Sequence, residues 1–145
     1  MAGSKREGGW MHTENPKRRF YSDGRGIWYI DRIWPLVAGL PEEVLAIDQV
    51  RELDEVCWFD DRWGVRPTCR LVIEHCQRIM NADMSYPVIL GPGGMVLDGV
   101  HRIAKAMLNG HATVKAVRLA ELPPPDETLS PDDPRYDPTP GSQTA

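Results

Sequence analysis

The feature that most constrains the fold is the segment from residue 87 to residue 110, where apolar runs alternate with glycines. Residues 87–90 and 95–98 are apolar runs of strand length, and the four residues between them, Gly-Pro-Gly-Gly, have the composition of a turn. A helical period follows at once, with apolar residues at 100, 103, 104, 107 and 108, and Asn109-Gly110 suits a helix C-terminus. We therefore predict a β-hairpin that leads directly into a helix.

A second helix is predicted over residues 69–80, with Thr68 as its N-cap. Apolar residues recur there at helical spacing, and we expect them to face the core: Cys69, Val72, Ile73, Cys76, Ile79 and Met80. Residues 44–48 and 113–119 read as strands. The order strand, helix, strand, turn, strand, helix, strand predicts a small α/β (α+β) domain with a mixed sheet and packed helices.

At 145 residues the chain has room for one domain, which excludes a two-domain enzyme. We expect that domain to occupy residues 44–122. Residues 1–43 are rich in basic residues and tryptophan, and we expect them to form an arm that packs partly on the domain. Residues 123–145 hold five acidic residues, one base and seven of the thirteen prolines, with few aliphatic residues. Because such a tail buries little apolar area, we predict that it is disordered.

The chain lacks an apolar run long enough to cross a membrane and an N-terminal secretory signal, so we expect a cytoplasmic protein. Cys57, Cys69 and Cys76 are an odd number of cysteines, with spacings that match neither a zinc ribbon nor a redox C-x-x-C motif. We interpret them as reduced core thiols and predict no metal site of protein ligands.

The densest group of chemically useful residues lies where the predicted hairpin becomes a helix: Asp98, Gly99, Val100, His101, Arg102 and Lys105. The first amides of a helix have no intrahelical partner and therefore favour anions. Gly99 lets ligand oxygens approach the backbone, and Arg102 can bind phosphate with two hydrogen bonds. We predict a phosphate pocket here. The alternative is structural, with Asp98 as an N-cap and His101 and Arg102 on the polar face of an amphipathic helix.

Residues 87–119 resemble the ParB/sulfiredoxin superfamily, with the likeness extending over residues 44–119. It is carried by the strand at 87–90, the glycine turn, the motif Asp98-Gly-Val-His-Arg-Ile-Ala-Lys-Ala106, and the final strand. The resemblance implies that the helix after Gly99 binds nucleotide phosphates. It also implies a polar box before the other helix, which would bring Arg66 and Thr68 to the same phosphates.

Two departures narrow the choice within the superfamily. Val100 stands where sulfiredoxins carry their catalytic cysteine, so sulfiredoxin activity is not expected. Partition proteins continue into a helix-turn-helix region, whereas this chain continues into a Pro-rich acidic tail, which argues against sequence-specific DNA binding. What remains resembles a stand-alone version of the fold, as in the free serine kinases and in uncharacterised single-domain relatives.

The resemblance implies a nucleotide (ATP, ADP or CTP) with Mg²⁺, and phosphoryl transfer to a small molecule or nucleotide hydrolysis. Phosphoryl transfer needs a carboxylate to orient or deprotonate the acceptor, for which Asp98, Asp54 and Glu55 are candidates. His101 adds a group that titrates near neutrality. The expected catalytic set is thus Asp98, His101 and Glu55.

Three alternatives remain open at the level of the sequence. His75 is either a structural histidine or, with Arg78, reaches the rim of the pocket. The whole chain is either an enzyme or a non-catalytic ParB-like binding module for a protein partner or, less favoured, DNA. Aromatic residues between Trp10 and Trp34 would support a homodimer if they are exposed.

Overall fold

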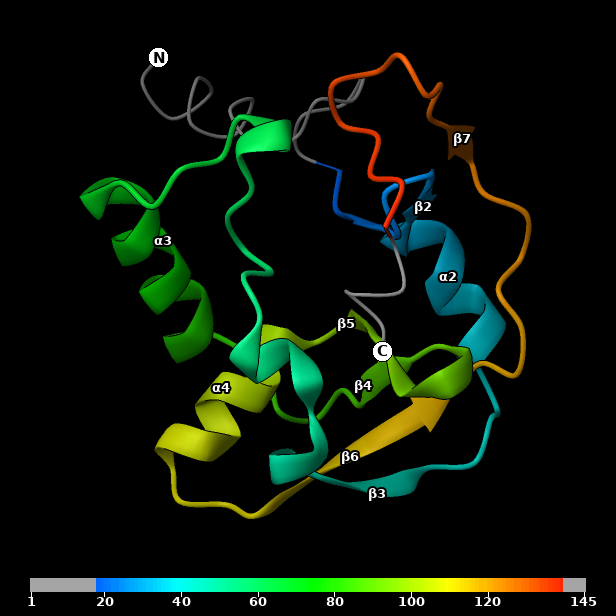
Figure 1. Ribbon diagram of the computed structural model, residues 1–145. Helices are drawn as coiled ribbons and strands as arrows, with labels where there is room; N and C mark the ends of the chain where they lie inside the picture. The colour runs from blue at the N-terminus through cyan, green and yellow to red at the C-terminus, as the bar shows by residue number, and fades with distance from the viewer. Residues whose placement is uncertain (1–17, 140–145) are drawn as a thin grey trace.

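The computed structural model describes residues 18–139 of the chain. These residues form three α-helices and two β-sheets, which confirms the predicted α+β class. Figure 1 shows the larger sheet at the bottom, α3 and α4 on one side, and α2 with the smaller sheet on the other. No helix in the described part of the chain is both long and apolar enough to cross a membrane.

The larger sheet contains four strands in the order β3 (Glu43–Ala46), β6 (Thr113–Arg118), β4 (Val88–Leu90) and β5 (Val96–Asp98). The β4–β6 pair is parallel and the other two pairs are antiparallel, so the sheet is mixed as predicted. The hairpin β4–β5 turns through the short 3₁₀ segment Pro92–Gly94. This hairpin delivers the chain to the first turn of the next helix.

Helix α4 (Val100–Leu108) has its predicted limits, and its buried residues are Ile103 and Ala106. They pack in one core cluster with Val88, Leu90 and Ala116 of the sheet. The chain leaves α4 through Gly110, whose φ of +80° is readily adopted by glycine. α4 is therefore held by the sheet along one face.

Helix α3 (Cys69–Met80) also begins and ends as predicted, and the Thr68 side chain accepts a hydrogen bond from the Leu71 amide. Its buried face was predicted wrongly. The buried residues of α3 are His75, which contacts His101 of α4, and Leu71, which packs in a core cluster with Ile27 and Tyr29 of β2 (Gly26–Tyr29). The apolar stripe is largely exposed, 58% for Ile73 and 71% for Met80. Periodicity located the helix, but the position of its neighbours determined which face is covered.

The three cysteines were also expected in the core, and all three are free and exposed. Cys69 and Cys76 lie on α3, and Cys57 lies on the irregular segment that precedes it. The exposure of Cys69 and Cys76 has the same cause as that of Ile73, since these residues lie on the side of α3 that faces solvent.

The smaller sheet has the order β1 (Phe20–Ser22), β2 (Gly26–Tyr29) and β7 (Glu127–Thr128), and β2 runs directly into α2 (Ile30–Val37). All four residues of β2 are buried. β2 and the inner face of α2 are therefore part of the folded core, which corrects the expectation that this segment is an arm packing only partly on the domain. Residues 1–17, with Trp10, lie outside the described part.

The aromatic residues expected to offer a dimer surface are used inside the protein. Trp28 is buried in the cluster that also contains Ile33, Ile89 and Val117, and Tyr29 is buried in a second cluster. The described residues therefore provide no exposed aromatic surface of the predicted kind between residues 18 and 34.

The expectation of a disordered tail is wrong for residues 123–139. β7 pairs with β2, Leu129 is 4% exposed, and the Trp28 Nε1–H donates to the Pro123 carbonyl oxygen at 2.7 Å. Asp137 is buried and forms an ion pair with Arg62 at 3.2 Å. Backbone pairing and polar anchors hold this segment, and a criterion based on aliphatic content does not detect them. Residues 140–145 lie outside the described part.

Candidate functional site

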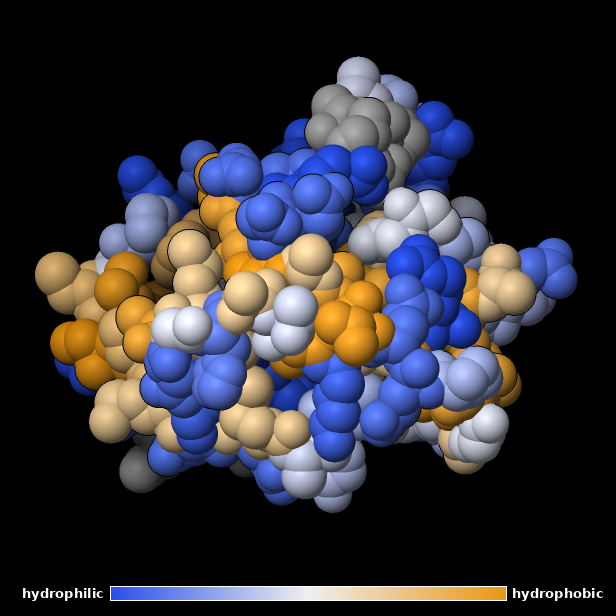
Figure 2. Space-filling model, turned by 90° about the horizontal axis from the view of Figure 1, so that it is seen from below, coloured by the Kyte–Doolittle hydropathy of each residue, from blue (hydrophilic) through white to orange (hydrophobic). Residues whose placement is uncertain are grey.

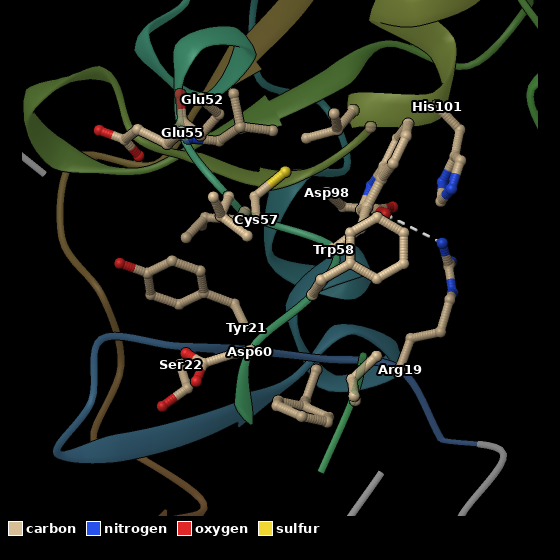
Figure 3. A pocket seen from close by; sticks show the side chains of 18 of the residues that line it. Arg19, Tyr21, Ser22, Glu52, Glu55, Cys57, Trp58, Asp60, Asp98 and His101 are labelled. Atoms are coloured by element: carbon tan, nitrogen blue, oxygen red, sulfur yellow. Dashed lines mark hydrogen bonds and ion pairs between the residues drawn. The ribbon is translucent and has the colours of Figure 1, made fainter. Parts of the chain in front are cut away.

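A cavity of about 660 Å³ lies where the first turn of α4 meets β1, α3 and the irregular segment 52–65. Figure 3 shows its two ends, with Arg19 and His101 on one side and Glu52 and Glu55 on the other. Trp58 and Asp98 lie near the middle. The start of α4, singled out by the sequence, therefore opens into a cavity of ligand size.

Asp98 is the centre of a buried polar network at the cationic end. Its carboxylate is 7% exposed and accepts hydrogen bonds from Arg19 Nη1 at 2.9 Å, Trp34 Nε1 at 3.1 Å and Arg102 Nη2 at 3.3 Å. It does not cap α4, whose N-cap residue is Gly99. Both carboxylate oxygens are engaged by these donors, so Asp98 positions the two arginines and is poorly placed to bind a proton of a substrate.

Gly99 is required by the backbone and by its neighbours. Its φ is +124°, and a Cβ built there would lie 3.0 Å from Arg102 Nη2 and 3.2 Å from the Val88 Cα. The sequence suggested that Gly99 leaves space for a ligand. In the structure that space is taken by Arg102 and Val88, so the glycine allows the arginine to pack under the start of the helix.

His101 points to His75 rather than into an open phosphate site. His75 Nδ1 and His101 Nε2 are 2.8 Å apart, so one ring donates a hydrogen bond and the other accepts it. Burial, together with the nearby charge of Arg78, lowers the pKa of His75 to about 4. Burial and the neighbouring His75 lower the pKa of His101 to about 3. Both imidazoles are therefore neutral near pH 7, and this Nε2 of His101 is already engaged.

Trp58 is half-buried and lines the cavity. Its ring stacks on both imidazoles, with centroid distances of 4.6 Å to His75 and 4.6 Å to His101 and interplanar angles of 10° and 8°. Phe59 adds an edge-on contact to His75. The histidine pair is thus enclosed by aromatic rings, which explains why its charged form is disfavoured.

The cationic end offers several donors to an anion. Arg19, Arg78 and Arg102 line the cavity, and the buried Nε of Arg102 has no hydrogen-bond acceptor among residues 18–139. The first intrahelical bond of α4 runs from the Ile103 amide to the Gly99 carbonyl, at 3.0 Å. The amides before Ile103 therefore have no helical partner and lie at the positive end of the helix dipole.

The other end of the cavity is acidic. Glu52 accepts a hydrogen bond from the Val96 amide at 2.8 Å. Burial and the neighbouring Glu52 raise the pKa of Glu55 above its usual range. Within residues 18–139, no group of three or more His, Cys, Asp or Glu side chains could hold a metal ion. Of the three predicted catalytic residues, Glu55 is the one whose carboxylate is best suited to proton transfer.

Three residues predicted to bind phosphate lie elsewhere. Arg66 is 79% exposed and pairs with Asp61 at 3.7 Å, while Thr68 caps α3. Lys105 Nζ donates to the carbonyl oxygens of Met80 and Ala82, at 2.9 and 3.0 Å. None of the three lines the cavity. The roles of Thr68 and Lys105 follow from the ends of α3, which needs an N-terminal acceptor and C-terminal donors.

His75 and Arg78 both line the cavity, so the alternative that placed them at the pocket is the one the geometry supports. Sequence reasoning did not identify Arg19, Trp34 or Trp58 as site residues. Arg19 meets Asp98 across 79 positions of the chain, and Trp34 across 64. No local pattern indicates such contacts, although two tryptophans, Trp28 and Trp34, lie within sixteen positions of the pair Arg18-Arg19 and could have suggested that this part of the chain contributes to a site.

No protein-family model, curated protein or solved structure matches this chain. Function is therefore inferred from the cavity and the residues that line it.

Proposed function

We propose that this chain is a nucleotide-binding protein of the ParB/sulfiredoxin-like kind, which holds phosphate groups at the start of α4. The observation that carries the proposal is the convergence of Arg19, Arg78 and Arg102 on one cavity with the free amides of the first turn of α4. Guanidinium groups and helix N-termini are the two commonest ways in which proteins bind phosphate.

The cavity has the right size and charge distribution for a mononucleotide. Its volume of about 660 Å³ lies inside the range of about 300–1,000 Å³ typical of small-molecule sites. ATP, ADP or CTP would place its phosphates at the arginines. Mg²⁺ bound to nucleotides is held mainly by phosphate oxygens and water with one or two carboxylates, and Glu52 and Glu55 are available in the cavity for that purpose.

The proposed reaction is phosphoryl transfer to a small-molecule acceptor or to water. Glu55, at the end of the cavity opposite the arginines, would accept the proton of an acceptor hydroxyl bound between the two ends, since its raised pKa brings it closer to neutrality than an ordinary carboxylate. Asp98 would keep Arg19 and Arg102 aimed at the transferred group. We propose a cytoplasmic location for this activity, which the three free cysteines favour because exposed thiols persist where the environment is reducing.

A second candidate is a non-catalytic ParB-like module that binds the nucleotide as a signal. It is favoured by one observation, that two of the three expected catalytic groups are already engaged within the protein: Asp98 with two arginines and His101 with His75. Phosphate release that is lost in Glu55→Gln would exclude it, and tight binding without turnover would favour it.

The experiment that tests the binding is a thermal-shift series with ATP, ADP, CTP and pyrophosphate, with and without Mg²⁺. A ligand at about 100 times its Kd stabilises the folded state by about 2.7 kcal/mol, which is readily measured. Arg19→Gln should reduce the shift, because it removes an exposed guanidinium of the site without emptying the core. Arg66→Gln is the matched control, since it removes an arginine outside the cavity.

A shift in the wild type that Arg19→Gln reduces and Arg66→Gln preserves supports the phosphate site. Equal losses in both variants would mean that the ligand responds only to overall charge, and no shift with any phosphate would end the proposal.

A further inference from the structure

The two imidazoles form a flat platform two rings wide. Their planes differ by 10° and their centroids are 5.1 Å apart, while the bonded nitrogens Nδ1 of His75 and Nε2 of His101 are 2.8 Å apart. The centroid separation equals this nitrogen–nitrogen distance plus the distance from each bonded nitrogen to the centre of its own ring. The rings therefore lie edge to edge in nearly one plane.

Trp58 covers this platform from one side only. It is nearly parallel to both rings and lies 4.6 Å from each centroid. If the imidazoles lay on opposite faces of the indole, their centroids would be separated by at least about 7 Å, twice the ~3.5 Å contact distance of stacked rings. The observed 5.1 Å is too short for that arrangement, so both imidazoles contact the same face.

The other face of Trp58 belongs to the cavity. Trp58 is half-buried and lines it, and the aromatic rings stacked on Trp58 within residues 18–139 are those of the two histidines. Figure 3 shows His101 on one side of Trp58 and Cys57 and Tyr21 on the other. The hydrogen-bonded histidines therefore support one face of the Trp58 ring, and the opposite face is directed to the cavity.

We infer that this face of Trp58 is a stacking site for the base of the nucleotide, and that it favours purines over pyrimidines. An indole is bicyclic, so a bicyclic base overlaps more of it than a single ring does. His101 belongs to the first turn of α4, so the indole that stacks on it adjoins the phosphate donors at the start of that helix. This inference rests on the proposed function, because it assigns the base end of the same ligand.

Calorimetric titration of the wild type with ATP, CTP and inorganic tripolyphosphate tests it. ATP should bind more tightly than both CTP and tripolyphosphate, since only ATP combines the phosphates with a bicyclic ring. Trp58→Ala should weaken ATP binding by roughly 5- to 150-fold, the range that follows from base–aromatic stacking energies, and leave tripolyphosphate binding within about twofold. Tyr86→Ala removes a 52% exposed aromatic ring outside the cavity and is the matched control.

Trp58→Phe keeps one ring and should reduce the preference for ATP over CTP while preserving the fold, so the test holds even if the alanine variant does not fold. Equal affinity of the wild type for ATP and tripolyphosphate would overturn the base site and leave the phosphate site standing. An equal loss of affinity for ATP and for tripolyphosphate in the Trp58 variants would also overturn the base site and leave the phosphate site standing. Failure of all three ligands to bind the wild type would instead overturn the proposed function, and the base site with it.

Discussion

Helices α3 and α4 have similar sequence patterns but different surroundings. Both were expected to bury an apolar stripe. α4 buries Ile103 and Ala106 against the sheet, whereas α3 buries Leu71 and the polar His75 and leaves Ile73 exposed. α4 lies on the sheet, and α3 lies beyond it with a cavity along its inner side. The comparison shows that the neighbours of a helix decide which face is buried: α3 turns His75 inward, where it lines the cavity, although its apolar stripe lies on the other side.

Figure 2 shows apolar residues gathered on one face of the molecule, interrupted by charged side chains. The exposed apolar residues of the two helices are Val72, Ile73, Met80, Met107 and Leu108. Scattered exposure of this kind is common on protein surfaces and carries little stability. The stability of the two helices should therefore depend on their inner faces.

The largest effect is expected from Ile103→Ala, which removes a fully buried side chain between α4 and the sheet. Such a cavity-forming change should lower the free energy of unfolding by about 2–5 kcal/mol, measured by urea denaturation. Ile73→Ala makes the same chemical change on the 58% exposed face of α3 and should alter stability by less than about 0.5 kcal/mol. Similar losses in both variants would mean that the outer face of α3 is covered in solution.

The start of α4 should tolerate no side chain at position 99. Gly99→Ala combines a φ of +124° with contacts of 3.0–3.2 Å to Arg102 and Val88, and should cost about 1–3 kcal/mol of unfolding free energy. Gly110→Ala, at the other end of the same helix, has a positive φ but no atom within 4 Å of the added Cβ. It should cost less, and the difference between the two thermal unfolding curves measures the crowding at Gly99.

The histidine pair should make the protein sensitive to mild acid. Both pKa values are lowered in the folded protein, His75 to about 4 and His101 to about 3, while unfolded histidine titrates near about 6.5. Below that pH the unfolded chain binds more protons, so the contribution of the pair is complete above about pH 6.5 and is lost as the pH falls toward 4. The positive charges of Arg78, Arg19 and Arg102 also lower the pKa values of the pair, whereas the negative charge of Glu74 raises that of His75.

Unfolding free energies measured between pH 7 and pH 4 check this expectation. His101→Gln should flatten the dependence, because the neutral amide cannot be protonated. His111→Gln, at an exposed position, should leave it unchanged. A wild type whose stability is constant down to pH 4.5 would contradict the neutral pair.

A smaller effect is expected at the N-terminus of α3. Thr68→Ala removes the oxygen that accepts from the Leu71 amide at 3.2 Å, and should lower stability by about 1 kcal/mol. Thr68→Ser keeps the oxygen and should restore most of the loss. Because Thr68 lies outside the cavity, nucleotide affinity should be the same in both variants, and a selective loss of affinity in Thr68→Ala would return this residue to the phosphate site.

Features that depend on near neighbours in sequence were predicted well. The limits of both long helices, the cap at Thr68, the glycine end at Gly110 and the hairpin of the mixed sheet all follow from residues within a few positions of one another. The candidate site was predicted only in part. Gly99 and Arg102 do lie at the start of α4 in the cavity, as does His101, although its contacts differ from those expected.

The smaller sheet was missed because its central strand has no local signature. β2 is buried at every position, so it lacks the alternation of a half-exposed strand, and its partner β7 lies near the other end of the chain. The Tyr29 amide, for example, donates to Asp126 across 97 positions. The folded state of residues 123–139 was missed for the same reason, since the partners of this segment in β2 lie far away in the sequence.

The sequence by itself determined the local elements, the class of fold and the residues that open α4, because helical period, turn composition and capping act over a few positions. Only the tertiary structure showed that Arg19 and Trp34 donate hydrogen bonds to Asp98, and that His75 is bonded to His101 beneath Trp58. It also showed that Thr68 and Lys105 bind the backbone at the two ends of α3 instead of lining the cavity. Those contacts depend on which distant segments are brought together, and burial against a particular neighbour then sets whether a polar side chain faces a cavity, a helix end or solvent.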